Sequence, residues 1–324
     1  MTPAPTCPPV PSGATDPATH RTPSFFHSSA REGFAALLDV VLEGRPDGDR
    51  GVLLPAFVGW SPREGSGVFD PVQSSSAEPR FYATQDDLTV DPDIVEGALA
   101  AGGVAVLVVI HYFGRTDPSL PRLRALADEH GAVLVEDLAH GFFSARAAGE
   151  AGRHGHAALF SLHKMFPLRD GGVLTCRDPQ LAVGMTSTRP DLAAALFDVD
   201  WRSVADHRRS VWTELVVRLQ ALPGHGTDFW LPWTSLCDDV PHTLPVVLLH
   251  ADRDAVYHGM NAEGFGVVSL YHTLIGPVRD AFPAEVLLST RILNLPVHQD
   301  VPVDALPALV ECFARHMEAA STTS

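Results

Sequence analysis

The chain has 324 residues, of which 45% are hydrophobic and 19% charged, and its formal net charge is −16. This composition is typical of a globular protein. The excess of acidic residues argues against a surface for nucleic acid or for an anionic membrane. The apolar runs fall short of the roughly 20 residues that a membrane-spanning helix needs. The length predicts one large and one smaller domain.

Residues 1–23 are rich in proline and threonine and lack the apolar centre of a signal peptide, so we expect a flexible arm. The chain has four cysteines, and they do not form the close pairs that zinc sites use. Such cysteine usage fits a reducing cytoplasm, where we expect this protein. Beyond the arm, we expect residues 24–200 to form the large domain and residues 201–320 the small one.

The first elements along the chain alternate between helices and strands. Residues 28–44 predict a helix that Ser28 and Ser29 can cap, because apolar residues follow at helical spacing. Further on, strands are predicted over 51–57, 104–114, 132–141, 157–164 and 171–178, and helices over 91–102 and 119–131. Strands that alternate with helices of this length indicate an α/β fold with a doubly wound, mostly parallel sheet.

The pattern changes at about Trp201. A long helix is predicted over 201–224, a strand over 241–250 and a final helix over 303–320. This mixture predicts a second, smaller α+β domain at the C-terminal end.

Lys164 is the only lysine in the chain, and the other 22 basic side chains are arginine. A desolvated lysine can lose its proton and attack a carbonyl carbon, which a guanidinium cannot do. Lys164 stands in the stretch SLHKMFPLRDGG, shortly before the pair Gly171 and Gly172. The alternative is an ordinary surface lysine.

Other polar residues fall where predicted strands end, which is where open α/β sheets bind ligands. Asp137 closes an apolar run, and it either faces a cationic ring nitrogen or caps the next helix. The helix start at Ser29, Ala30 and Arg31 either holds a phosphate or is capped in the ordinary way. Ser161 either adds a phosphate contact or bonds to the backbone.

A carbonyl-reactive lysine, a buried aspartate and a phosphate cup together point to pyridoxal 5′-phosphate as the cofactor. The lysine would hold the cofactor's aldehyde as an imine. The aspartate would keep the pyridine nitrogen protonated, so that the ring accepts electrons from the substrate carbon. His154 and His156 have no carboxylate or cysteine at ligand spacing, so we expect no metal site.

The order of these residues resembles the DegT/StrS family of fold type I pyridoxal-phosphate enzymes, best known as sugar aminotransferases. In that family a strand ends in Glu-Asp, a polar residue follows three places after the Asp, and Phe-Ser, a lysine and Gly-Gly come later. The matching residues here are Glu136, Asp137, His140, Phe160, Ser161, Lys164, Gly171 and Gly172. The likeness runs from about Phe25 to the C-terminal helix.

The resemblance implies a role for each matched residue. Lys164 would form the covalent link to the cofactor and Asp137 would meet the pyridine nitrogen. His140 would lie near the phenolic oxygen of the ring, and Ser161 would reach toward the phosphate.

The resemblance also implies that Phe57 or Trp60 stacks on the cofactor ring, and the sequence leaves both open. It further implies a homodimer with two active sites at the interface.

Two features depart from the family pattern. Only two residues separate Ser161 from Lys164, whereas many relatives have four. The segment after Cys176 is short and does not match the asparagine–arginine stretch through which a neighbouring subunit touches the phosphate. Some relatives carry a histidine in place of the lysine and remove a hydroxyl group. Here Lys164, and not the adjacent His163, has the family's spacing to Gly171.

The sequence therefore predicts an aminotransferase that makes an amine on a keto-sugar, a keto-cyclitol or a related small metabolite from an amino donor. Lys164 would move the proton as general base and acid. One alternative is a pyridoxal-phosphate-dependent decarboxylase, lyase, racemase or cyclase acting on an amino acid. The other is a cofactor-binding regulator without enzymatic activity.

Overall fold

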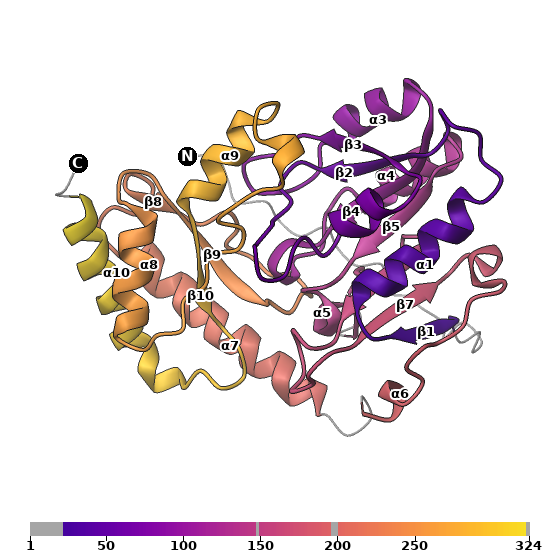
Figure 1. Cartoon of the computed structure of the whole chain (residues 1–324). Coiled ribbons are helices and arrows are strands. Elements are labelled where there is room, and N and C mark those ends of the chain that lie inside the picture. The colour runs from indigo at the N-terminus through magenta and orange to yellow at the C-terminus, as the bar shows by residue number, and fades with distance from the viewer. Residues whose placement is uncertain (1–21, 147–148, 196–199, 322–324) are drawn as a thin grey trace.

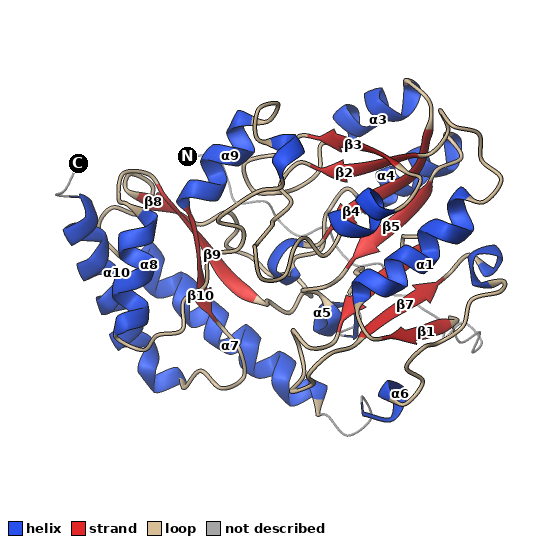
Figure 2. Cartoon of the chain, in the orientation of Figure 1, coloured by secondary structure: helices blue, strands red, loops and turns tan. Residues whose placement is uncertain are grey.

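The computed structural model describes residues 22–146, 149–195 and 200–321. Nearly all of the expected flexible arm, up to residue 21, lies outside the described residues. Figure 1 shows a large sheet and a smaller sheet side by side, each covered by helices. The strands of the large sheet lie between Ser24 and Cys176 in the chain, and the smaller sheet comes from the segment that begins with the long helix α7. Figure 2 shows the strands of both sheets in red and the helices in blue.

The large sheet has seven strands in the order β1-β7-β6-β5-β4-β2-β3. These are β1 (Ser24–His27), β2 (Gly51–Pro55), β3 (Glu78–Tyr82), β4 (Val104–Ile110), β5 (Val133–Asp137), β6 (Ala157–Ser161) and β7 (Gly172–Cys176). Strands β2 to β6 pair in parallel, whereas β7 is antiparallel to both of its neighbours. The physical reason is the connection 162–171, which carries the lysine and is too short for the crossover that a parallel pair needs.

Helices cover both faces of this sheet, which confirms the doubly wound α/β fold. Helix α1 (Ala30–Leu42) buries its apolar stripe in one cluster together with Val106 and Val108 of β4. The alternate residues of the same strand, Leu107 and Val109, lie in a second cluster with α3 (Pro92–Ala100) and α4 (Leu120–Glu129). Successive side chains of a strand point to opposite faces, so one apolar strand supports both layers.

The smaller sheet is antiparallel, with the order β10-β9-β8. Its strands are β8 (Phe229–Trp230), β9 (Thr243–Leu248) and β10 (Ile292–Pro296), and its helices are α7 (Trp201–Gln220), α8 (Arg253–Ala262), α9 (Pro283–Arg291) and α10 (Leu306–Ser321). The short helices are α2 (Phe69–Ser74), α5 (Phe142–Arg146) and α6 (Leu192–Ala195). Within the described ranges, no helix is both long and apolar enough to cross a membrane.

The two sheets share one apolar cluster, which includes Leu37 and Val108 from the large sheet's side and Val246 and Leu295 from the smaller one. The loop after β2 also pairs with a C-terminal segment. Trp60 N donates to Thr273 O at 2.9 Å and Ile275 N donates to Val58 O at 3.0 Å. This pairing brings residues from the second half of the chain to the carboxyl ends of the large sheet's strands.

Candidate active site

The structure brings Lys164, Asp137 and His140 together at the carboxyl ends of β5 and β6. Asp137 is the last residue of β5, and its Oδ1 accepts the N–H of Ala139 at 2.8 Å, which turns the chain toward His140. Lys164 follows β6, and its Nζ lies 3.3 Å from His140 Nε2. Residues 24 positions apart in the sequence are thus in hydrogen-bond contact. The predicted grouping of these side chains is present in the fold.

The surroundings of Lys164 favour its uncharged form. Burial lowers the pKa of its amine, and the charge of Arg31 lowers it further, while Asp137 and Glu64 partly oppose this shift. Part of the residue is nevertheless exposed to solvent. An amine that is surrounded by protein yet accessible to a small molecule is suited to attack a carbonyl.

His140 and Asp137 are perturbed in the same environment. Burial lowers the pKa of His140 well below its usual value, and the nearby Lys164 adds to this, so the imidazole is neutral. Burial raises the pKa of Asp137, while the N–H of Ala139 and the charge of Lys164 hold it back. A carboxyl group in this position gains from a cation placed against it.

The first turn of α1 lies next to the lysine loop. In the sheet register, Ser161 of β6 pairs with Gly172 of β7, and Gly172 pairs with His27 of β1. Gly171 N donates to Ser28 O at 2.8 Å. A Cβ on Gly172 would lie only 2.1 Å from Ala30 N, so this glycine is what allows α1 to approach the sheet.

The residues predicted to hold the phosphate, Ser29, Ala30 and Arg31, lie at the N-terminus of α1, where the helix caps itself. Ser29 Oγ accepts the N–H of Glu32 at 3.1 Å, and the Glu32 carboxylate accepts the N–H of Ser28 at 2.9 Å. Arg31 donates to Glu64 O at 2.6 Å and lies 3.4 Å from Asp70. Ordinary capping is therefore present at this helix start, beside an arginine whose buried Nε has no partner among the described residues.

Ser161 and the two candidate aromatic residues occupy different positions. Ser161 is buried, with its Oγ 3.3 Å from His163 Nδ1. Phe57 is fully buried beneath Tyr112 and Tyr271, with ring centroids 5.7 and 5.8 Å away. Trp60 is 40% exposed.

Two residues near the site carry no sequence signal. Tyr271 packs closely over Gly59, and its ring centroid lies 6.4 Å from that of His140. His242 stacks on His140 at 4.6 Å with an angle of 8° between the rings. Both come from the second half of the chain, more than 100 positions from His140, so only an observed contact could reveal them.

Glu136 points away from the site. Its carboxylate accepts the N–H groups of Gly152 and Gly155 at 2.6 and 2.5 Å and pairs with buried His111 at 2.9 Å. This network anchors the loop that follows α5. Glu136 is therefore a structural residue, although it stands next to Asp137.

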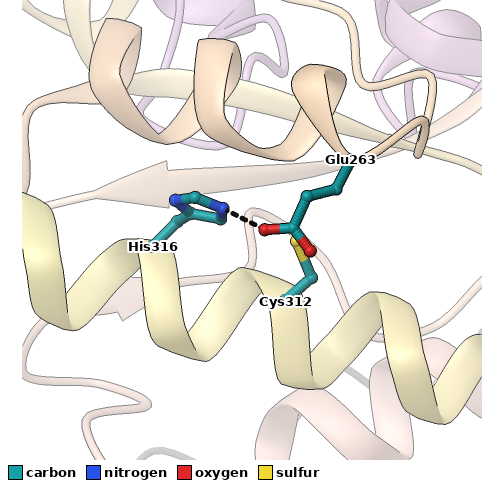
Figure 3. Close-up of side chains that lie close together, drawn as sticks. All are labelled: Glu263, Cys312 and His316. Atoms are coloured by element: carbon teal, nitrogen blue, oxygen red, sulfur yellow. Dashed lines mark hydrogen bonds and ion pairs between the residues drawn. The ribbon is translucent and has the colours of Figure 1, made fainter.

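The histidines His154 and His156 each pair with one carboxylate, from Glu150 and Asp128. A different group of possible metal ligands lies between α8 and α10, where Glu263, Cys312 and His316 come together (Figure 3). There the Glu263 carboxylate already pairs with His316 at 2.7 Å and with Arg315 at 2.9 Å. The arginine supplies the positive charge that a metal ion would bring, so this group is complete as an ion-pair cluster.

Comparison with known proteins agrees with the motif. Residues 66–191 match the model of the DegT/DnrJ/EryC1/StrS aminotransferase family. The erythromycin biosynthesis sensory transduction protein EryC1 of Saccharopolyspora erythraea is 28% identical over 64% of this chain and 64% of its own length. The L-glutamine:2-deoxy-scyllo-inosose aminotransferase of Streptomyces kanamyceticus is 36% identical over 33% of this chain.

The chain spans less than two thirds of these curated relatives, and only 25% of the Streptomyces kanamyceticus enzyme. The structural similarity covers more of the chain than the sequence similarity does. The structure of the aminotransferase TlmJ from Streptoalloteichus hindustanus superposes with a TM-score of 0.73 at 21% identity, over 91% of this chain and 86% of that one. Sequence similarity to the DegT/DnrJ/EryC1/StrS aminotransferase family thus covers residues 66–191, and the likeness of fold to TlmJ covers most of the chain.

Proposed function

We propose that this protein is a pyridoxal-phosphate-dependent aminotransferase that acts on a keto-sugar, a keto-cyclitol or a related small metabolite in a biosynthetic pathway. The observation that carries the proposal is the contact of Lys164 Nζ with His140 Nε2 at 3.3 Å, beside Asp137, at the carboxyl edge of the sheet. The Streptomyces kanamyceticus relative, which is named for transfer from L-glutamine to a keto-cyclitol, supports the substrate class.

The residues present fit this cofactor. An accessible amine with a lowered pKa suits the aldehyde. Burial raises the pKa of Asp137, and a ring cation beside this carboxyl group would lower it again and favour the carboxylate. Lys164 would hold the aldehyde carbon, Asp137 the pyridine nitrogen and His140 the phenolic oxygen. Pyridoxal phosphate supplies the electron sink when it is bound.

The phosphate group would lie where β6, the lysine loop and α1 meet. We propose Ser161 and the segment Ser29, Ala30 and Arg31 as its ligands, because Ser161 pairs with Gly172 and the backbone of Ser29 and Ala30 lies against that glycine. Free N–H groups of a helix start and a guanidinium both favour an anion. Glu32 opposes it, since its carboxylate lies in the same first turn.

The chemistry of the chain's own groups is proton transfer. With its lowered pKa, Lys164 can take a proton from the substrate carbon and return it to another atom. Neutral His140 lies within hydrogen-bond distance of the amine, with 3.3 Å between Nε2 and Nζ, and so holds the amine in a defined orientation.

We also propose that the protein works as a homodimer in the cytoplasm, with residues 24–200 as the cofactor-binding domain and 201–320 as the smaller domain. Phe57 and Trp60 remain the candidates for stacking on the cofactor ring. The exposed ring of Trp60 is the more accessible of the two, because Phe57 is covered by Tyr271.

The deciding experiment is the half-reaction with an amino donor. Protein loaded with pyridoxal phosphate is mixed with glutamate or glutamine, and the cofactor absorbance is followed without a second substrate. We expect bleaching, release of a keto acid, and recovery of the absorbance on addition of 2-oxoglutarate. Consumption of an amino acid with release of carbon dioxide or loss of chirality, and no bleaching, would instead favour a decarboxylase or racemase.

The cofactor link has an unusually clean control. Borohydride should fix the bound cofactor to Lys164, and no second lysine exists to confuse the peptide map. The variant Lys164→Arg should fold normally, show no fixed cofactor and lose turnover. Unmodified Lys164 after reduction of fully loaded protein would refute the assignment.

A further inference from the structure

His242 is one of the two residues near the site that carry no sequence signal. It precedes β9 and lies flat against His140, with ring centroids 4.6 Å apart and 8° between the planes. His140 in turn contacts the Lys164 amine at 3.3 Å. The three side chains thus form a row from the second half of the chain to the reactive lysine.

The backbone around His242 is held from several directions. Its N–H donates to Phe113 O at 2.6 Å. The neighbouring Pro241 O accepts from buried Arg208 at 3.3 Å. Ser144 Oγ accepts the N–H of Val240 at 2.9 Å. A loop with this many anchors presents the ring of His242 in one fixed place.

The imidazole of His242, in contrast, has a buried Nδ1 atom without a hydrogen-bond partner among the described residues. Burial, with the charges of Arg208, Lys164 and His298, lowers its pKa to about 3, so the ring is neutral at physiological pH. His242 therefore interacts with the site through the stacking of its ring face on His140. A flat neutral ring excludes water from one side of His140 without adding charge.

We propose that His242 is a positioning residue, which acts on Lys164 through the ring of His140. By stacking on His140, His242 fixes the plane of that ring, so that Nε2 faces the amine of Lys164 and the His140 ring remains shielded from water. This inference rests on the proposed role of Lys164, but it concerns the free protein and can be tested without the cofactor.

The charges around Lys164 determine how its pKa should respond to the loss of His242. The charged groups that act on Lys164 are Asp137 and Glu64, which raise its pKa, and Arg31, which lowers it. None of these touches His242 in the described structure. If the stacked ring is removed, water gains access to buried His140 and to the side of Lys164 that His140 covers, and the pKa values of both groups should rise toward those of exposed groups.

The test uses the single lysine as its own reporter. Protein labelled with ¹³C at the lysine Cε carbon gives one side-chain resonance, and its shift against pH yields the pKa of Lys164 directly. We expect His242→Ala to raise this pKa by about one unit, a tenfold change in the acidity of the amine. His242→Phe keeps a flat ring and should stay close to the unaltered protein.

A matched control is His225→Ala, since His225 also packs on an aromatic ring, that of Phe229, but in the smaller sheet. It should leave the Lys164 titration unchanged. An unchanged pKa in folded His242→Ala overturns the proposal. An equal rise in His242→Phe and His242→Ala also overturns it, because the nitrogen atoms and not the stacked face would then matter. Failure of the protein to bind pyridoxal phosphate would refute the proposed function but leave the titration result standing.

Discussion

Replacing Gly172 by alanine tests how closely α1 approaches the large sheet. The added Cβ would lie 2.1 Å from Ala30 N, 2.1 Å from the carbonyl carbon of Ser29 and 2.5 Å from its oxygen. Ordinary contacts begin at about 3.4 Å, and all three atoms belong to backbone, so a side-chain rotation cannot relieve the clash. The first turn of α1 must therefore move by more than about 1 Å away from β7.

The magnitude follows from opposing contributions. Overpacking of this kind destabilises a protein by about 1–3 kcal/mol. Because the clashing atoms belong to the backbone, we expect a value near the upper end of this range. Against it stand about 0.8 kcal/mol for one buried methyl group and about 0.4–1 kcal/mol from the stiffer unfolded chain. We expect a net loss of about 1–2 kcal/mol in the free energy of unfolding. Because the displaced turn carries Ser29 to Arg31, the affinity for pyridoxal phosphate should fall as well.

The assay is urea unfolding followed by circular dichroism, together with a cofactor titration. Gly97→Ala is the matched control, because a Cβ there meets no atom within 4 Å and Gly97 lies inside α3. That variant should gain up to about 1 kcal/mol from helix propensity and keep its cofactor affinity. If Gly172→Ala unfolds at the same urea concentration as Gly97→Ala and binds the cofactor equally well, the close approach does not exist.

Two further predictions concern the neighbouring carboxylates of β5. Burial raises the pKa of Glu136, but His111 and the N–H groups of Gly155 and Gly152 outweigh this effect and hold the pKa below its usual value. Glu136→Gln should therefore destabilise the fold by about 3 kcal/mol near pH 7, and the difference in urea midpoint should disappear as the pH falls through the lowered pKa of the folded state. Asp137→Asn should keep the fold and the cofactor but reduce turnover by about two to three orders of magnitude, because the charge opposite the ring cation is lost. Near-normal turnover of Asp137→Asn would make this residue only a cap.

The sequence by itself determined those parts of the protein that depend on local pattern. Apolar runs and helical spacing located most strands and helices of the large sheet. The stretch from Glu136 to Gly172 showed the resemblance to the family whose model matches residues 66–191. Strand β3 was missed, because EPRFY mixes charged and aromatic residues without a clear alternation. The reversed direction of β7 was not foreseen, although the short lysine loop implies it.

Only the tertiary structure decided which residues meet. Glu136 and Asp137 are adjacent, so they point to opposite faces of β5, but only the packing shows that Glu136 holds the loop at Gly152 and Asp137 faces Lys164. In the folded chain Phe57 also lies beneath Tyr271, and His242 stacks on His140. Such contacts join segments more than 100 residues apart, so they leave no local pattern in the sequence. They depend on the shared core that aligns the two sheets, and this core forms only in the folded chain.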